Sequence, residues 1–338
     1  YQADVSLASE ELMRLLKWIK LEPKAMASSV YKKMLLTASV SGNFDKFQVS
    51  PFKVVLDNTT FSGDAGVVLG ERKDIMLNVN ANTLNFDNYI NSIPEEIKVK
   101  NFADRMNYRF SKLNSLNDFD MVLNANANLV IYESLPFEKV KFKGNILQGK
   151  MEIENLNIER AANTKLDFSG KISGFGSKAN FEDMQYSVET KDITNMIEKF
   201  GLYKPEVDYN KFGDLVASGV LNGELDNFGI NTQFTSGDLT ANYAGTVMLA
   251  DDFIFDGDVE LKYPETTTFV KAVGMNYEPQ SSNLGMFRLK SNIKGSVDNL
   301  KLTAMELNSG YTKFDGEVSY DFRGDNKVAD ANLKVNKI

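Results

Sequence analysis

Apolar and polar residues alternate with a period of two along much of this chain, which is the pattern of β-strands that have one apolar face. In one such segment Phe61, Ala65 and Val67 occupy one set of alternating positions, and Ser62 and Asp64 occupy the other. We count roughly twenty segments of this kind at a spacing of about 8–12 residues, which is typical of all-β proteins. The pattern therefore predicts a mainly β chain of antiparallel strands.

One stretch of predicted strands and turns is repeated three times in the sequence, at 41–69, 222–249 and 294–322. Each copy opens with a glycine, has an aspartate three residues later, and has a Phe or Leu two residues after that. An aromatic-x-Gly sequence follows at a nearly constant distance, since the two glycines lie 63−42 = 21, 245−223 = 22 and 316−295 = 21 residues apart. A repeated unit of this kind cannot bury its apolar face alone and has to stack on its neighbours.

Short amphipathic helices interrupt the strands. Leu12, Leu15, Leu16 and Ile19 have the i, i+3, i+4, i+7 spacing of a helix with one apolar face, and Ser9 is the expected N-cap. We expect Trp18, the only tryptophan, to cover an apolar end of the sheet.

The same helical spacing recurs 181 residues later at 193–200, so the large repeat includes the helix. A degenerate third copy is expected at 266–274. The sequence Ser92-Ile93-Pro94-Glu95 matches a capping box, which predicts a further helix that runs to about Tyr108. The seven prolines are expected in turns or at the ends of elements and never in the middle of a strand.

Composition excludes several classes of function. The 338 residues carry 46 acidic and 38 basic side chains, a net charge of −8, which argues against a nucleic-acid partner. The chain has no cysteine and no histidine, so a thiol nucleophile, a disulfide, a Ser-His-Asp triad and a His-ligated metal are all impossible. We expect no cofactor, and we expect the protein not to be an enzyme.

The acidic residues with a recognisable pattern are interpreted as parts of turns. Asp45, Asp226 and Asp298 occur once in each copy of the repeat, whereas a catalytic residue would normally occur once in a chain. The sequence Asp256-Gly257-Asp258, and the pair at 251–252, could suggest calcium, but the rest of an EF-hand pattern is missing and Asp-Gly between strands is a common turn. Neither a metal site nor a catalytic site is predicted, although composition leaves a carboxylate pair for glycoside hydrolysis open.

The apolar face of the predicted strands is the most informative feature. A long sheet with one apolar face has to close on itself, pack on a second sheet, or cover other apolar material such as acyl chains, and periodicity alone does not choose among these. The inward positions, which are the candidate lining of a groove, are Phe61, Ala65, Val67, Leu77, Val79, Leu123, Ala125, Ala127, Leu129, Phe142, Ile146, Phe168, Leu215, Leu221, Tyr243, Val247, Phe287, Leu289, Phe314, Val318 and Leu333.

Three segments carry a resemblance to a known family. The sequences DNTTFSG at 57–63 and LNFDNYI at 84–90, in a pattern of helix, strands and aromatic-x-Gly, resemble the AsmA family of Gram-negative envelope proteins. The segment 119–170, with LQGKM at 147–151, is similar to the family's C-terminal portion. The resemblance implies a periplasmic β-groove, or β-taco, which hangs from an inner-membrane helix and carries phospholipid acyl chains toward the outer membrane. It implies no catalytic residues.

On this basis the expected fold is mainly β, an elongated and curved antiparallel β-sheet groove built from pseudo-repeats with a few short amphipathic helices. We expect a first groove repeat with its N-terminal helix at 1–92, a connecting helix and central strands at 93–185, a second repeat with its helix at 186–263, and a third, degenerate repeat at 264–338. These parts are expected to form one continuous groove, cut from a longer chain whose membrane helix is absent here.

The expected function is passive phospholipid transport between membranes, with outer-membrane homeostasis as its consequence. The expected partners are phospholipid acyl chains, the inner membrane and outer-membrane components, and the expected location is the periplasm. One alternative is a factor for outer-membrane protein assembly whose sheet edge pairs with nascent strands. Another is a carbohydrate-active β-helix protein, which would need a carboxylate cluster in a cleft.

Overall fold

The structure is a computed structural model of the chain, and it describes residues 1–18, 20, 30–90, 93–98, 100–199, 213–249, 253–272, 284–296, 298–321, 323 and 328–337. The chain divides into two compact units, Tyr1–Val99 with Arg105–Asn180 and Lys100–Asp104 with Phe181–Ile338. We call them unit 1 and unit 2 and describe each by itself.

The elements follow one another along the chain in a regular order. The first nine strands are β1 (Gln2–Ser9), β2 (Met34–Gly42), β3 (Lys46–Leu56), β4 (Thr59–Val68), β5 (Lys73–Asn85), β6 (Phe119–Tyr132), β7 (Leu135–Leu147), β8 (Lys150–Ala161) and β9 (Thr164–Ser173). The other nine are β10 (Asn180–Thr190), β11 (Leu215–Glu224), β12 (Asn227–Ser236), β13 (Leu239–Leu249), β14 (Phe253–Tyr263), β15 (Phe287–Gly295), β16 (Asn299–Ser309), β17 (Thr312–Asp321) and β18 (Val328–Lys337). The helices are α1 (Leu12–Trp18), η1 (Phe86–Asn88), α2 (Glu95–Lys98), α3 (Phe102–Ser111), η2 (Asn114–Asn117), α4 (Ile193–Lys199) and α5 (Thr266–Ala272).

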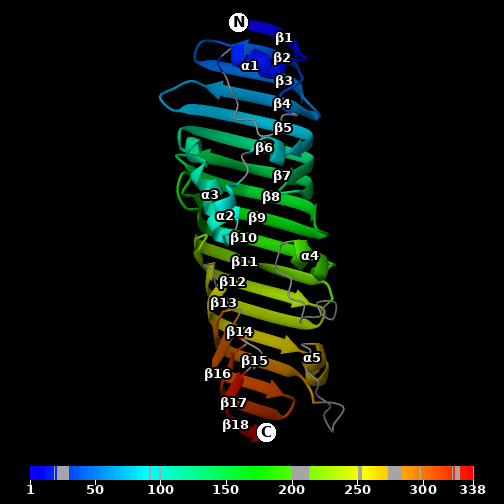
Figure 1. Cartoon of the computed structure of the whole chain (residues 1–338), viewed down its shortest axis with the longest axis vertical. Coiled ribbons are helices and arrows are strands. Elements are labelled where there is room, and N and C mark those ends of the chain that lie inside the picture. Colours follow the sequence, from blue (N-terminus) through cyan, green and yellow to red (C-terminus); the bar gives the residue numbers. More distant parts are fainter. Residues whose placement is uncertain are drawn as a thin grey trace. The chain divides into compact units, whose positions relative to one another are not determined.

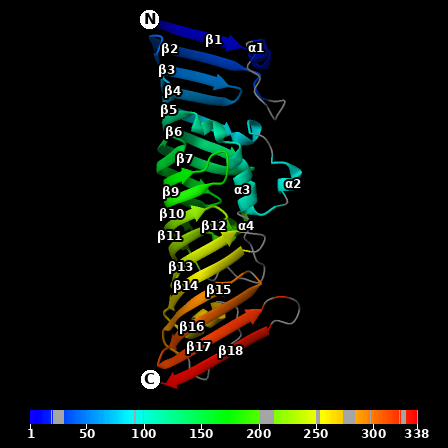
Figure 2. The same ribbon diagram turned by 90° about the vertical axis from the view of Figure 1, so that its left-hand side faces the viewer.

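The predicted fold class is confirmed. The described chain is mainly β, with 67% of it in strands and few short helices, and the strands of each unit form an open sheet. In unit 1 each strand from β1 to β9 pairs with the next one along the chain, and in unit 2 the same holds from β11 to β18 (Figure 1). Within the described residues of unit 1, no second sheet layer lies over its strands (Figure 2).

The antiparallel prediction is wrong at one pair of strands. Strands β5 and β6 run parallel, with Lys73 opposite Phe119 and Asn85 opposite Ile131. A parallel pair needs a long crossover connection, and residues 86–118 supply it through η1, α2, α3 and η2.

The single helix predicted from the capping box at 92 to about Tyr108 is in fact two helices. Helix α2 ends at Lys98, and the side-chain oxygen of Asn101 then accepts a hydrogen bond of 2.8 Å from the backbone amide of Asp104. Asn101 therefore caps the first turn of α3, so a new helix begins there. Ser92, the predicted cap, lies outside the described residues.

Three further expectations are corrected. Pro51 lies inside β3, at a shift of register between Val49 and Phe52, which is one of the few places where a strand tolerates a proline. Trp18 covers no apolar end, because its side chain is 80% exposed. Asp256-Gly257-Asp258 is not a turn but the middle of β14, where Gly257 lies directly opposite Gly245 of β13.

The sequence repeat corresponds to a repeat of elements. Helix α1 begins at Leu12 and α4 at Ile193, a shift of 193−12 = 181. The same shift carries the first residues of β2, β3 and β4 onto those of β11, β12 and β13 to within one residue. A further shift of 266−193 = 73 carries α4 onto α5, and β11, β12 and β13 onto β15, β16 and β17 with equal accuracy. Each copy is thus a short helix followed by a run of antiparallel strands.

Five of the six glycines of the repeated motif lie where two strands approach too closely for a side chain; at the sixth, Gly223, an added Cβ would lie 3.0 Å from the carbonyl oxygen of Asn227. A Cβ added to Gly63, Gly245 or Gly316 would lie 1.9, 2.4 or 2.0 Å from a carbonyl oxygen of the next strand. A Cβ on Gly42 or Gly295 would lie 2.1 or 2.2 Å from the carbonyl oxygen just beyond the hairpin turn. The close approach of the backbones therefore requires glycine at these positions, which explains why these glycines recur in the copies of the repeat.

Helix α5 is joined to the segment before β15 through Glu265, which directly precedes the helix. The Glu265 carboxylate accepts hydrogen bonds from the backbone amide of Thr268 at 2.7 Å, from the Thr268 hydroxyl at 3.0 Å, and from the amide of Leu284 at 3.3 Å. Desolvation opposes ionisation of this carboxyl, but the amides and hydroxyls of Thr267 and Thr268 outweigh it and lower the pKa of Glu265 to about 2. The ionised carboxylate is therefore part of the folded state.

We expect Glu265→Gln to lower the stability of the chain at neutral pH and to lose that effect in acid. The folded-state pKa lies below the ordinary value of 4.5, so the carboxylate stabilises the fold fully above about pH 4.5 and loses this effect as the pH falls toward about 2. Urea midpoints of the wild type and the variant should converge over that range. Glu317→Gln, on the polar face of β17, is the control for loss of one charge, and a difference that persists at low pH would contradict the role of Glu265.

Candidate functional site

Strand registers place the apolar residues of unit 1 on one face of its sheet. Residues directly opposite each other on paired strands point to the same face. Each of four rows crosses the strands from β4 to β9 and consists of apolar residues and glycine. The rows are Phe61–Ala81–Ala127–Val140–Ile158–Leu166, Gly63–Val79–Ala125–Phe142–Leu156–Phe168, Ala65–Leu77–Leu123–Gly144–Ile153–Gly170 and Val67–Ile75–Met121–Ile146–Met151–Ile172.

These rows include every lining residue predicted for unit 1 except Leu129. That residue lies opposite Thr83 and Glu138, beyond a point where the ladder between β5 and β6 is interrupted and Lys139 of β7 has a positive φ of 51°. The alternation of the sequence continues through this point, but the backbone is irregular there. The prediction for Leu129 therefore has no support from the rows.

The apolar face is only partly covered in the middle of unit 1. Neither β5 nor β6 contains a fully buried residue, although Leu77, Leu123 and their row neighbours are all apolar. The opposite face of the same strands is polar, and the side-chain amide of Asn126 donates to the Asn80 side chain at 3.1 Å, as expected for a face in water. One face of this sheet is thus suited to water and the other to apolar material.

Unit 2 has the same arrangement, and in both units part of the apolar face is buried: in unit 1 the predicted lining residue Ile146 is only 3% exposed. All nine lining residues predicted there share one face of its sheet: Leu215, Leu221, Tyr243, Val247, Phe287, Leu289, Phe314, Val318 and Leu333. Near α5, however, this face is filled by the protein itself. Phe269 of α5 stacks on Phe287 with ring centroids 4.2 Å apart, and Phe287 and Leu289 are buried together with Met305. These two residues belong to a small hydrophobic core.

A cavity of about 700 Å³ adjoins one end of the apolar face of unit 1. Val140 and Ile158 belong both to the row of Phe61 and to the cavity wall, so the apolar surface is continuous between them. The remaining wall comes from the strand ends, from the crossover between β5 and β6, and from the segment before β2. Its residues are Tyr31, Phe86, Tyr89, Ile90, Tyr108, Arg109, Lys112, Leu113, Val130, Tyr132 and Phe137.

Carboxylates fix two segments of the cavity wall by accepting backbone hydrogen bonds. Asp57 accepts from the amide of Tyr31 at 2.8 Å and from the next two amides at 2.9 and 3.1 Å. Asp87 accepts from the amides of Glu133 and Ser134 at 2.7 and 2.8 Å. Tyr31 then packs edge-on against Tyr89 with ring centroids 5.6 Å apart. The aromatic wall is therefore held in place by the turns that flank it.

The cavity contains positive charge in apolar surroundings. The Lys112 ammonium lies 4.7 Å from the centre of the Tyr108 ring, and the Arg109 guanidinium carbon lies 5.6 Å from the centre of the Tyr132 ring, both within cation–π range. The Arg109 side chain is 19% exposed and its Nη2 atom lies 3.4 Å from Glu133. Burial raises the pKa of Tyr132, and burial together with Asp57 raises that of Tyr89, as expected in a poorly solvated pocket.

The sequence did not predict this cavity, although Phe86, Tyr89 and Ile90 of its wall lie in the segment 84–90 that carries the family resemblance. The wall residues come from segments between 31 and 158 that only the crossover brings together. The one local signal was the concentration of aromatic residues between the strand segments, at Phe86, Tyr89 and Tyr108, outside any period-two pattern.

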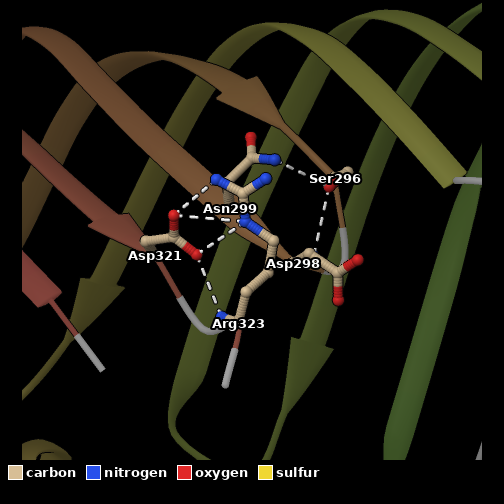
Figure 3. A network of polar contacts seen from close by, with 5 residues as sticks. All are labelled: Ser296, Asp298, Asn299, Asp321 and Arg323. Carbon is tan, nitrogen blue, oxygen red and sulfur yellow. Dashed lines mark hydrogen bonds and ion pairs between the residues drawn. The ribbon is translucent and has the colours of Figure 1, made fainter. Parts of the chain in front are cut away.

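The motif aspartates lie in hairpin turns, as predicted. The backbone carbonyls of Asp45 and Asp226 accept hydrogen bonds of 2.7 and 2.9 Å from the amides of Leu69 and Leu249, which are equivalent positions in the first two copies. In the third copy the Ser296 hydroxyl accepts from the backbone amide of Asp298 at 3.1 Å (Figure 3). These hydrogen bonds use the backbone of the turn, which is a structural role.

A nearby polar contact completes that end of unit 2. The Arg323 guanidinium binds both carboxylate oxygens of Asp321, with the shortest contact at 2.6 Å, and lowers the pKa of Asp321 to about 2 (Figure 3). Both groups are solvent-exposed. Within the described residues, no group of three or more acidic side chains has the arrangement of a metal site. Asp256 instead pairs with Lys294 at 2.7 Å, while the pair at 251–252 lies outside the described residues.

Comparison of the chain with protein-family models, curated proteins and solved structures gave no match. No helix in the described ranges has both the length and the apolar character needed to cross a bilayer.

Proposed function

We propose that this chain binds the acyl chains of phospholipids along its apolar sheet faces and passes them passively between membranes, as an AsmA-like periplasmic protein would. The observation that carries the proposal is the set of apolar rows in unit 1, which cross β5 and β6 without a fully buried residue. A sheet face of this kind normally packs on a second layer. In the described part of unit 1 no second sheet covers it, and the row residues that are buried, such as Ile146, Ile153 and Ile158, lie on β7 and β8 rather than on β5 and β6 (Figure 2).

The energetics of the proposed mechanism are those of ordinary hydrophobic burial. An acyl chain that leaves water for the apolar rows gains about 25 cal/mol for each Å² of apolar surface removed from water. The rows offer equivalent apolar positions from one strand to the next, so a bound chain can shift along them in steps of similar free energy. In this mechanism the phospholipid head group stays in contact with water.

Lipid recovery tests the proposal directly. The purified chain should carry phospholipid that organic extraction and mass spectrometry detect, and the delipidated chain should take up phospholipid from vesicles. Recovery of no lipid, together with no uptake from vesicles, would exclude this function.

One observation favours the strand-pairing alternative. In the part of unit 2 that the structure describes, no strand pairs with the outer edge of β18, whose Val328 and Val335 side chains are 53% and 57% exposed. An exposed strand edge is a site at which another chain can add a strand. Cross-links from β18 to outer-membrane precursors, with none to lipid, would favour an assembly factor over a lipid carrier.

A further inference from the structure

We infer that the cavity of unit 1 is the site for the anionic head group of a phospholipid, with the phosphate bound by Arg109 and Lys112. This inference rests on the proposed function and names the part of the lipid that is recognised. The described residues that line the cavity include these two cations and no carboxylate. The wall is otherwise apolar or aromatic, so the charge of an occupant is the property that this site can select.

The position of the cavity matches an amphiphile. Its volume of about 700 Å³ lies within the range of about 300–1,000 Å³ that is typical of small-molecule sites. Val140 and Ile158 continue the apolar row of Phe61 into the cavity wall, so an acyl chain on the sheet face leads into the pocket. A free inorganic anion has no acyl chain and would gain nothing from the apolar row that leads into the cavity.

The two cations differ in burial in the way a head-group site requires. The Arg109 side chain is largely buried and lies over the Tyr132 ring, whereas Lys112 is exposed and lies over the Tyr108 ring. Arg109 can therefore form charge-assisted hydrogen bonds to phosphate in a poorly solvated environment, where such bonds are strong. Lys112 lies near the water that the rest of the head group needs. The Glu133 carboxylate lies 3.4 Å from Arg109 Nη2, so a phosphate bound by Arg109 would also lie near this negative charge.

The test uses photoreactive lipids on the full chain. Phosphatidylglycerol and phosphatidylcholine with identical acyl chains each carry the reactive group near the head-group end of one chain, and cross-linked peptides are mapped by mass spectrometry. In the wild type, peptides 86–90 and 105–113 should be labelled preferentially by phosphatidylglycerol. Arg109→Gln with Lys112→Gln should lower that preference by about tenfold, because charge-assisted hydrogen bonds are lost.

Controls separate the head-group site from general charge effects. Lys141→Gln with Lys143→Gln removes the same charge from the polar face of β7 and should leave the preference unchanged. Lys112→Gln alone changes an exposed side chain, so it tests the inference even if the double variant fails to fold. An unchanged preference in the folded double variant would overturn the assignment, as would an equal loss in the β7 control. If the double variant does not fold, an unchanged preference in the Lys112 variant alone would overturn it.

The outcomes also distinguish this inference from the proposed function. If neither lipid labels the rows or the cavity, both fail. If both lipids label the strands equally and the wild-type cavity shows no preference, the head-group assignment alone fails. Inorganic phosphate is the third arm: it should displace the lipid only weakly, and complete displacement at millimolar concentration would overturn the lipid site in favour of a free-phosphate site.

Discussion

We expect Ala127→Asp to reduce the phospholipid bound to unit 1 by at least about tenfold, because an ionised carboxylate among acyl chains is strongly unfavourable. Ala127 lies in the row between Ala81 and Val140, next to the cavity. Its side chain is small and only partly buried, so the substitution adds charge to the face without opening a hole in a core. Lipid recovered after purification, or taken up from vesicles, measures the effect.

The neighbouring residue supplies a matched control. Asn126→Asp adds the same charge one position away, on the polar face, where the side chain is exposed beside Asn80. This variant should bind as much lipid as the wild type. Equal recovery from both variants would show that the apolar rows do not hold acyl chains. Circular dichroism and urea midpoints of the two variants establish that the comparison is between folded proteins.

The sequence predicted the strands well because the alternation of apolar and polar residues is visible locally and decides which face of the sheet each side chain occupies. The alternation at 75–84 became β5 (Lys73–Asn85), and a shift by one residue would have turned Leu77 and Val79 to the other face. The predicted helix at 193–200 likewise became α4 (Ile193–Lys199), with Phe200 outside the described residues. In each case the choice of face depends only on the spacing of apolar residues.

The features that the sequence did not predict depend on contacts between residues far apart in the chain. Asp256-Gly257 has the local features of a turn, but pairing with Gly245 extends the strand through it. The capping box at 92 predicted a helix within the crossover, yet nothing local fixes the parallel direction of β6. The cavity follows from that crossover, since Arg109 of α3 and Lys112, which directly follows α3, line it together with the strand ends. Candidate faces could therefore be read from the sequence, whereas the pocket could not.

The close approach of β13 and β14 leads to a second large effect, on stability. We expect Gly245→Ala to lower the free energy of unfolding by about 3 kcal/mol, the upper part of the range for overpacking a well-packed site. A Cβ there would lie 2.4 Å from the carbonyl oxygen of Asp256 and 2.5 Å from the Cα of Gly257. Both are backbone atoms, so relief requires the strands to move apart, which breaks the hydrogen bonds between them.

Gly229 of β12 is the control for this prediction because it lies on the adjacent strand and has room for a side chain. The atom nearest to a Cβ added at Gly229 is the carbonyl oxygen of Asn222, at 3.7 Å, which is an ordinary van der Waals contact. Gly229→Ala should therefore be neutral or slightly stabilising, since alanine restricts the unfolded chain more than glycine does. Urea unfolding of both variants measures the difference. Equal midpoints would mean that the aromatic-x-Gly motif is not maintained by backbone contact, and its recurrence in three copies would then need another cause.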